Sequence, residues 1–119
     1  MKMKKEMKGM TAADLADKLE MTKLTTNSEQ NNNVTGVYCG DLLSWVMSHA
    51  KKGDAWITVH THLNIVAVAL LVEAACVILP EDIRIEEATR KKAEQQGVVI
   101  LGSALSAYEI SWRIHEILH

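Results

Sequence analysis

A helical spacing of apolar residues, i, i+3, i+4 and i+7, appears in the middle of the chain at Leu43, Val46, Met47 and Ala50. This spacing predicts a helix that buries one face. Asp41 stands where a residue could cap the start of that helix. Lys51 and Lys52 followed by Gly53 are typical of a helix end. We therefore expect one amphipathic helix between Asp41 and Gly53.

Two further helices have capping signals. Thr11 and Asp14 have the spacing of a capping box, in which each side chain bonds the backbone of the other residue. Ser106 and Glu109 repeat this spacing near the C-terminus. The apolar stripe that follows the second box is formed by Ile110, Ile114, Ile117 and Leu118. The stripe predicts a final helix that packs against the core.

The remaining helical segments differ in polarity. Residues 83–96 are rich in charged side chains and are followed by Gly97, so they predict a solvent-facing helix that Gly97 ends. Residues 65–74 are apolar on every side, which predicts a helix covered by the rest of the protein. The β-branched content of residues 65–74 leaves a strand open as the alternative.

Short β-type segments lie between the predicted helices, at residues 21–25, 34–38, 55–60, 75–79 and 98–101. Several of them are aliphatic throughout, without the alternation of apolar and polar residues that a strand with one solvent-exposed face shows. This absence of alternation is typical of strands covered on both faces. From residue 55 onward, strands and helices alternate, as they do in βαβ units. The sequence predicts an α/β fold with three α/β/α layers and a small, mostly parallel sheet.

Composition narrows the class of protein. The chain has 119 residues, 48% of them hydrophobic, enough for one packed domain. A net charge of −2 and an aromatic content of 4%, with no Phe, argue against nucleic-acid binding. No apolar run reaches the roughly 20 residues that a membrane-spanning helix needs. We expect a flexible basic segment at residues 1–9, a single domain at residues 10–119, and a cytoplasmic location.

Polar side chains concentrate where strands of a parallel sheet should end. The segment after the third predicted strand holds Thr58, His60, Thr61, His62 and Asn64. Ligands of open parallel sheets bind at the carboxyl ends of the strands, where backbone N–H groups of helix N-termini also attract anions. We predict a ligand site at these residues, with Asp41 and Ser103 contributing from neighbouring connections. Helix capping by Thr61 and Asn64 is the competing interpretation.

The sequence gives weaker indications of a metal site or of a catalytic residue. His60 and His62, with Cys39 or Asp41, could supply metal ligands, but no complete ligand set follows from the spacing. Cys39 could be a reactive thiol near a helix N-terminus, but a plain turn at Cys39, Gly40 and Asp41 is the default interpretation. Cys76 lies in an apolar run and is expected in the core. The chain has no phosphate-binding loop, dinucleotide-binding glycine motif or serine-hydrolase elbow. We therefore predict a protein that is not an enzyme and needs no metal or other cofactor.

Residues 34–47 (VTGVYCGDLLSWVM) and 53–69 (GDAWITVHTHLNIVAVA) resemble stand-alone members of the DRTGG domain family. The flanking segments MTAADLADKL, KAEQQGVVIL and SALSAYE are similar as well, so the resemblance extends over nearly the whole chain. The motif that names the family is absent, and residues 31–36 read NNNVTG in its place. Roles of the Asp and Arg of that motif cannot be carried over to this chain.

The resemblance implies a fold similar to the N-terminal domain of HPr kinase/phosphorylase. It does not imply kinase activity, because the phosphate-binding loop of that enzyme lies in a separate domain. In larger relatives the domain accompanies phosphotransacetylases and CBS-domain pyrophosphatases, where it looks like a regulatory and dimerising module. Stand-alone members tend to accompany redox and hydrogenase-related genes.

Three functional hypotheses follow. The first is a non-catalytic regulatory module that binds a small anion or adenine nucleotide and acts as a homodimer on a partner protein, such as a redox or metabolic enzyme. Trp112 and the apolar helix at residues 65–74 would supply the dimer surface. The second is a structural adaptor of a redox or hydrogenase-related complex. The third is a small metal-dependent enzyme that uses His60 and His62.

Overall fold

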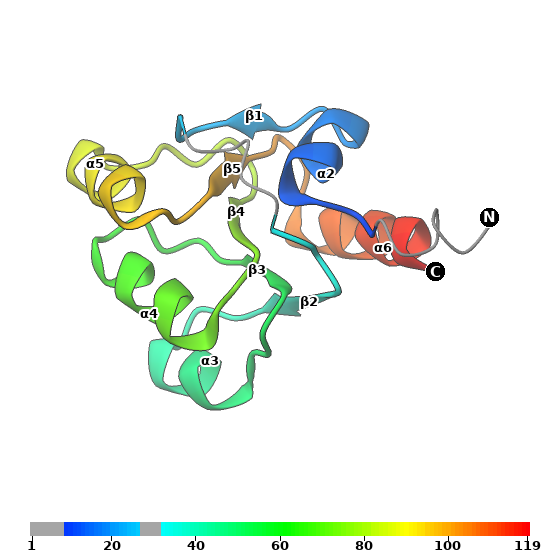
Figure 1. Cartoon of the computed structure of the whole chain (residues 1–119). Coiled ribbons are helices and arrows are strands. Elements are labelled where there is room, and N and C mark those ends of the chain that lie inside the picture. The colour runs from blue at the N-terminus through cyan, green and yellow to red at the C-terminus, as the bar shows by residue number, and fades with distance from the viewer. Residues whose placement is uncertain (1–8, 27–31) are drawn as a thin grey trace.

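One sheet runs through the part of the chain that the structure, a computed structural model, describes: residues 9–26 and 32–119. Its five strands within these residues follow the order β1-β5-β4-β3-β2 (Figure 1). The strands β2 to β5 are parallel, and β1 pairs antiparallel with β5. Their bounds are β1 Thr22–Lys23, β2 Gly36–Cys39, β3 Asp54–Ile57, β4 Cys76–Leu79 and β5 Ile100–Gly102.

Helices cover both faces of this sheet. Figure 1 shows α3, α4 and α5 on one face and α2 and α6 on the other. The described helices are α2 Ala12–Lys18, α3 Leu43–His49, α4 Asn64–Val72, α5 Glu87–Gln96 and α6 Ala107–Leu118. The predicted three-layer α/β fold with a mostly parallel sheet is confirmed. Residues 1–8 of the predicted N-terminal segment and residues 27–31 lie outside the described part of the chain.

The core is divided into two apolar clusters by the sheet itself. Successive side chains of a strand point to opposite faces. In β3, Ala55 and Ile57 therefore pack in the cluster beneath α2 and α6, while Trp56 packs with Val46 of α3 in the other cluster. Cys76 on β4 is buried in the core, as expected, and this burial raises the pKa of its thiol to about 12. Covering on both faces explains why the strands are aliphatic throughout.

The capping signals are largely confirmed. The Thr11 hydroxyl accepts the Asp14 N–H at 3.0 Å, and the Asp14 carboxylate accepts the Thr11 N–H at 3.3 Å. The Ser106 hydroxyl accepts the Glu109 N–H at 3.2 Å. The Glu109 carboxylate accepts bonds from the Trp112 and Arg113 side chains, which lie one turn further along α6. Gly97 ends α5 in a left-handed conformation, with φ of 78°.

The predicted boundaries of α3 are wrong in two respects. Leu42 occupies the N-cap position without a side-chain hydrogen bond, so Asp41 does not cap this helix. The helix ends at His49, three residues before Lys52, and Gly53 instead turns the chain into β3 with φ of 87°. Met47 was expected on the buried face, but it is 43% exposed because the neighbouring helix covers only part of α3.

Two other helices depart from the prediction. In α4, Ile65 and Val68 are buried, but Leu71 on the outer side is 66% exposed. The expectation that α4 is covered on every side is therefore wrong, since no further helix packs over its outer side in the described residues. The α5 helix begins at Glu87 rather than at residue 83, because residues 83–86 form an irregular connection after β4.

Gly36, the first residue of β2, lies in close approach to the neighbouring strand. A Cβ atom at Gly36 would lie 2.7 Å from Oδ1 of Asp54 on the adjacent strand. The Asp54 side chain cannot move away without cost, because its Oδ2 accepts the Lys51 N–H at 2.8 Å. A glycine is therefore required where β2 begins.

We predict that Gly36→Ala lowers the free energy of unfolding by about 1–3 kcal/mol, the usual cost of forcing an atom into a packed site. Urea unfolding followed by tryptophan fluorescence measures the effect. If the Asp54 carboxylate causes the cost, the same substitution should be nearly neutral in an Asp54→Ala background. An equal loss in both backgrounds would contradict this explanation.

Candidate functional site

Asp41, Thr58 and His60 form a hydrogen-bond network at the carboxyl ends of β2 and β3. Oδ1 of Asp41 accepts the Thr58 hydroxyl at 2.8 Å and the Val59 N–H at 2.9 Å. The Thr58 hydroxyl also accepts the His60 N–H at 3.2 Å, and the His60 ring hydrogen-bonds the Asp41 carbonyl oxygen. The carboxylate that was expected to cap α3 instead joins two neighbouring strand ends.

Thr61 connects this network to the next helix. Its carbonyl oxygen accepts the hydroxyl of Thr89 at 2.6 Å, and its own hydroxyl donates to the Glu86 carboxylate at 3.2 Å. Thr89 is fully buried on α5. The segment that leaves β3 is therefore held both by Asp41 and by the start of α5.

His62 and Asn64 lie at the exposed start of α4. The Asn64 N–H donates to Nδ1 of His62 at 3.1 Å. Leu63 is the N-cap residue and makes no side-chain capping bond, so the competing interpretation, capping by Thr61 and Asn64, is wrong. Among the described residues, the N–H groups of His62 and Leu63 have no hydrogen-bond acceptor. Both residues are exposed, at the positive end of α4.

Ser103 lies apart from the other predicted residues, because β4 separates its strand from β3. Its N–H donates to the Leu79 carbonyl at 3.0 Å, and its hydroxyl accepts the Leu105 N–H at 3.1 Å. It lines a separate cleft of about 370 Å³ that Asp82 and Arg84 also line. The structure therefore brings together Asp41, Thr58 and His60, extends them to Thr61, His62 and Asn64, and leaves Ser103 outside.

The two histidines are engaged in local hydrogen bonds. One ring nitrogen of His60 bonds the Asp41 carbonyl oxygen, and Nδ1 of His62 accepts the Asn64 N–H. Within residues 9–26 and 32–119, no group of three or more His, Cys, Asp or Glu side chains could hold a metal ion.

Cys39 is exposed at the end of β2 and contacts α6. Its Sγ lies 3.1 Å from the hydroxyl oxygen of Ser111. Both residues line a cleft of about 500 Å³ between β2 and α6, which Tyr108, Trp112 and His115 line as well. This cleft lies on the outer edge of the sheet, since β3 is the sole partner of β2 among the described strands.

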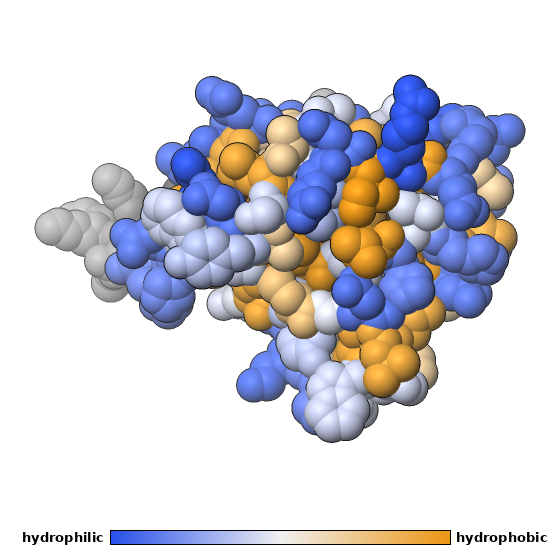
Figure 2. Space-filling view, turned by 180° about the vertical axis from the view of Figure 1, so that it is seen from behind, coloured by the Kyte–Doolittle hydropathy of each residue, from blue (hydrophilic) through white to orange (hydrophobic). Residues whose placement is uncertain are grey.

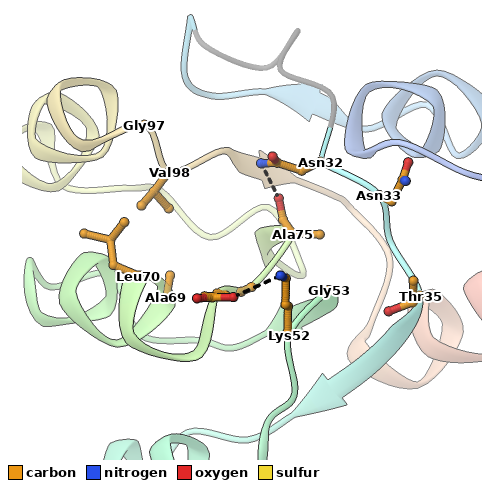
Figure 3. Close-up of a pocket in the computed structure, with 12 residues that line it drawn as sticks. Asn32, Asn33, Thr35, Lys52, Gly53, Ala69, Leu70, Ala75, Gly97 and Val98 are labelled. Atoms are coloured by element: carbon orange, nitrogen blue, oxygen red, sulfur yellow. Dashed lines mark hydrogen bonds and ion pairs between the residues drawn. The ribbon is translucent and has the colours of Figure 1, made fainter.

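A larger cleft, of about 620 Å³, lies at the opposite end of the strands (Figure 3). Its polar lining includes Asn32, Lys52 and Glu73, and the Lys52 ammonium lies 3.5 Å from the Glu73 carboxylate. This cleft is not predicted from the sequence, because Lys52 is assigned there to the end of a helix. One feature of the sequence points to it: Glu73 is a charged residue within the long apolar run between residues 63 and 79.

Apolar side chains also reach the surface. Figure 2 shows them in a band between hydrophilic margins, on the face opposite to that of Figure 1. Leu42, Val59 and Leu63, which follow β2 and β3 or begin α4, are among the large apolar residues that are exposed. No helix in the described ranges is both long and apolar enough to cross a membrane.

Known families and solved structures include matches to this chain. A family model described as the DRTGG domain matches residues 14–117. No curated protein matches the sequence.

Among solved structures, the fold is similar to the CBS and DRTGG domains of the regulatory region of Clostridium perfringens pyrophosphatase, a structure complexed with the activator diadenosine tetraphosphate. The TM-score is 0.70 at 12% sequence identity. The similarity covers 87% of this chain and 45% of the other, so this chain spans less than half the length of that regulatory region. At this level of identity the comparison shows a shared fold.

We predict that Asp41→Ala destabilises the protein by about 1–3 kcal/mol, because it leaves the buried Thr58 hydroxyl without its acceptor. Urea unfolding measures the loss. Asp17→Ala is the matched control, since Asp17 forms only an exposed ion pair with Lys23 and should change stability by less than about 1 kcal/mol. Equal stability of the two variants would show that the Asp41 network does not hold the strand ends.

Proposed function

Because the chain belongs to the DRTGG domain family, whose model matches residues 14–117, we propose that it is a non-catalytic regulatory module that binds a small anionic ligand. The observation that supports this proposal most is the match to the family model over residues 14–117. The fold shared with the regulatory region of a pyrophosphatase agrees with it.

The ligand site that we propose is the start of α4 and the loop before it. The N–H groups of His62 and Leu63, two exposed residues, are donors at a helix N-terminus, an arrangement that attracts phosphate and carboxylate groups. The His62 and Asn64 side chains are exposed beside them. The Asp41 network holds this loop in place before any ligand arrives, so binding costs little ordering of the loop.

The proposed ligand class is an adenine nucleotide. The pyrophosphatase region of similar fold was solved with diadenosine tetraphosphate, which carries four linked phosphates between two adenosines. Phosphates would meet the N–H groups at the start of α4. The exposed side chains of Val59 and Leu63 offer apolar surface beside them for a base.

We further propose that the module is a homodimer, which acts on a partner protein. Among the described strands, the outer edge of β2 has no partner, a feature that favours pairing with another strand. Tyr108 and Trp112 of α6 are exposed beside it, at 77% and 42%. A second copy of the chain would cover both the strand edge and these aromatic side chains.

Thermal unfolding and calorimetric titration of the full chain with diadenosine tetraphosphate, ATP, AMP and inorganic phosphate test the nucleotide proposal. A ligand at about 100 times its Kd should raise Tm by several degrees, because it binds the folded state selectively. His62→Ala should weaken binding about three- to tenfold, the effect of losing one hydrogen-bonding side chain.

His115→Ala is the matched control, because His115 is exposed on α6, away from the start of α4. It should bind as the wild type does. Absence of a Tm shift and of binding heat with every one of these compounds would overturn the nucleotide proposal and favour a structural adaptor.

Sedimentation equilibrium tests the dimer proposal. The wild type should have about twice the mass of the 13.2 kDa chain. Trp112→Glu should dissociate it, because it places a charge in the apolar part of the contact. Trp45→Glu, on the exposed side of α3, should remain dimeric. A wild-type monomer, or dissociation by both substitutions alike, would contradict the proposed interface.

A further inference from the structure

We propose that the 620 Å³ cleft at the amino ends of the strands binds a small aliphatic ammonium compound. The cleft is lined by Asn32, Asn33, Thr35 and Lys52 on one side and by the ends of α4 and α5 on the other (Figure 3). This is the edge of the sheet opposite to the proposed nucleotide site, and the group that it would bind is a cation rather than a phosphate.

The direction of the helix dipoles favours a cation in this cleft. In consecutive parallel βαβ units, each helix runs back against the strands and ends at their amino edge. Both α4 and α5 end at this cleft, at Glu73 and Gly97, in left-handed conformations. The C-terminal end of a helix carries partial negative charge, and it does so here although the Ala69 and Glu73 carbonyls already accept the N–H groups of Ala74 and Gly53. Two helix C-termini therefore make the cleft unsuited to phosphate and suited to an ammonium group.

A carboxylate strengthens this preference. Glu73 lines the cleft, and its partner Lys52 lies 3.5 Å away in an ion pair of which both members are mostly exposed, at 61% and 83%. Exposed pairs of this kind contribute little to stability. A ligand ammonium group can therefore replace Lys52 at Glu73 at small cost, which leaves the Lys52 ammonium for an anionic group of the same ligand.

The rest of the lining fits an aliphatic body. Ala69, Leu70, Ala74 and Val98 form an apolar wall next to Glu73, and Figure 3 shows the labelled side chains of Ala69, Leu70 and Val98 together on one side of the cleft. The Asn32 amide nitrogen donates to the Ala75 carbonyl at 3.1 Å, which fixes this side chain at the cleft. The apolar wall binds the hydrocarbon and the Glu73 carboxylate binds the ammonium group.

Two classes of ligand carry an ammonium group on an aliphatic body: an aliphatic α-amino acid and a simple aliphatic amine. The amino acid is favoured, because its carboxylate would pair with Lys52 while its ammonium group pairs with Glu73. A zwitterion of this kind replaces the existing ion pair with two new ones.

Two-dimensional ¹H–¹⁵N NMR of the full chain, titrated with L-leucine, 3-methylbutylamine or 4-methylpentanoate, tests the proposal. Leucine and the amine should shift the amide signals of Leu70, Ala74 and Gly97, with Kd values on the order of millimolar for ligands this small. Tighter binding of leucine identifies the amino acid as the source, and equal binding identifies the amine. Shifts of the same size with 4-methylpentanoate, or no shifts at these residues, would overturn the proposal.

Two substitutions test which charged side chains bind the ligand. Glu73→Gln should weaken both amine and leucine binding about tenfold or more, whereas Lys52→Gln should weaken leucine only. Glu81→Gln is the matched control, because Glu81 is also exposed and left-handed, with φ of 57° against 58° for Glu73, but follows the carboxyl end of β4. Equal effects of Glu73→Gln and Glu81→Gln would overturn the site. Nucleotide binding should survive Glu73→Gln, so this result is independent of the proposed function.

Discussion

The requirement that both faces of a parallel sheet be covered organises this molecule. Strands β3, β4 and β5 alternate their side chains between two apolar clusters, so each needs a helix layer on either side. The right-handed crossovers that supply one of these layers also orient α3, α4 and α5 alike. The sheet thereby acquires two chemically different edges, with helix N-termini at one and helix C-termini at the other.

This difference between the edges separates the two proposed sites. At the carboxyl edge, the N–H groups at the start of α4 are held by a loop that the Asp41 carboxylate anchors. At the amino edge, the ends of α4 and α5 face Lys52 and Glu73. One helix, α4, thus presents its positive end to the loop after β3 and its negative end to the cleft at the amino edge, which would allow a small module to bind groups of opposite charge at its two edges.

The fold was largely predictable because its signals are local. Strand positions follow from short aliphatic runs, and the Thr11 capping box and the Gly97 helix end require only neighbouring residues. The candidate residues at the strand ends were predictable for the same reason. Their roles were not, since Asp41 is adjacent to a helix in sequence and yet bonds Thr58, seventeen positions away. A short polar side chain next to a helix start has several competing partners, and the packing of the strands selects among them.

The sequence by itself therefore determined the α/β class, the parallel arrangement and the crowding of polar side chains after β3, because hydrophobic periodicity and caps encode them within a few residues. Only the tertiary structure decided which of those side chains meet, why Ser103 stands apart, and where Lys52 approaches Glu73. These three arrangements depend on the order of the strands in the sheet and on the residue at which each helix ends. A shift of three residues in the end of α3 moves Lys52 from a helix surface into the wall of a cleft.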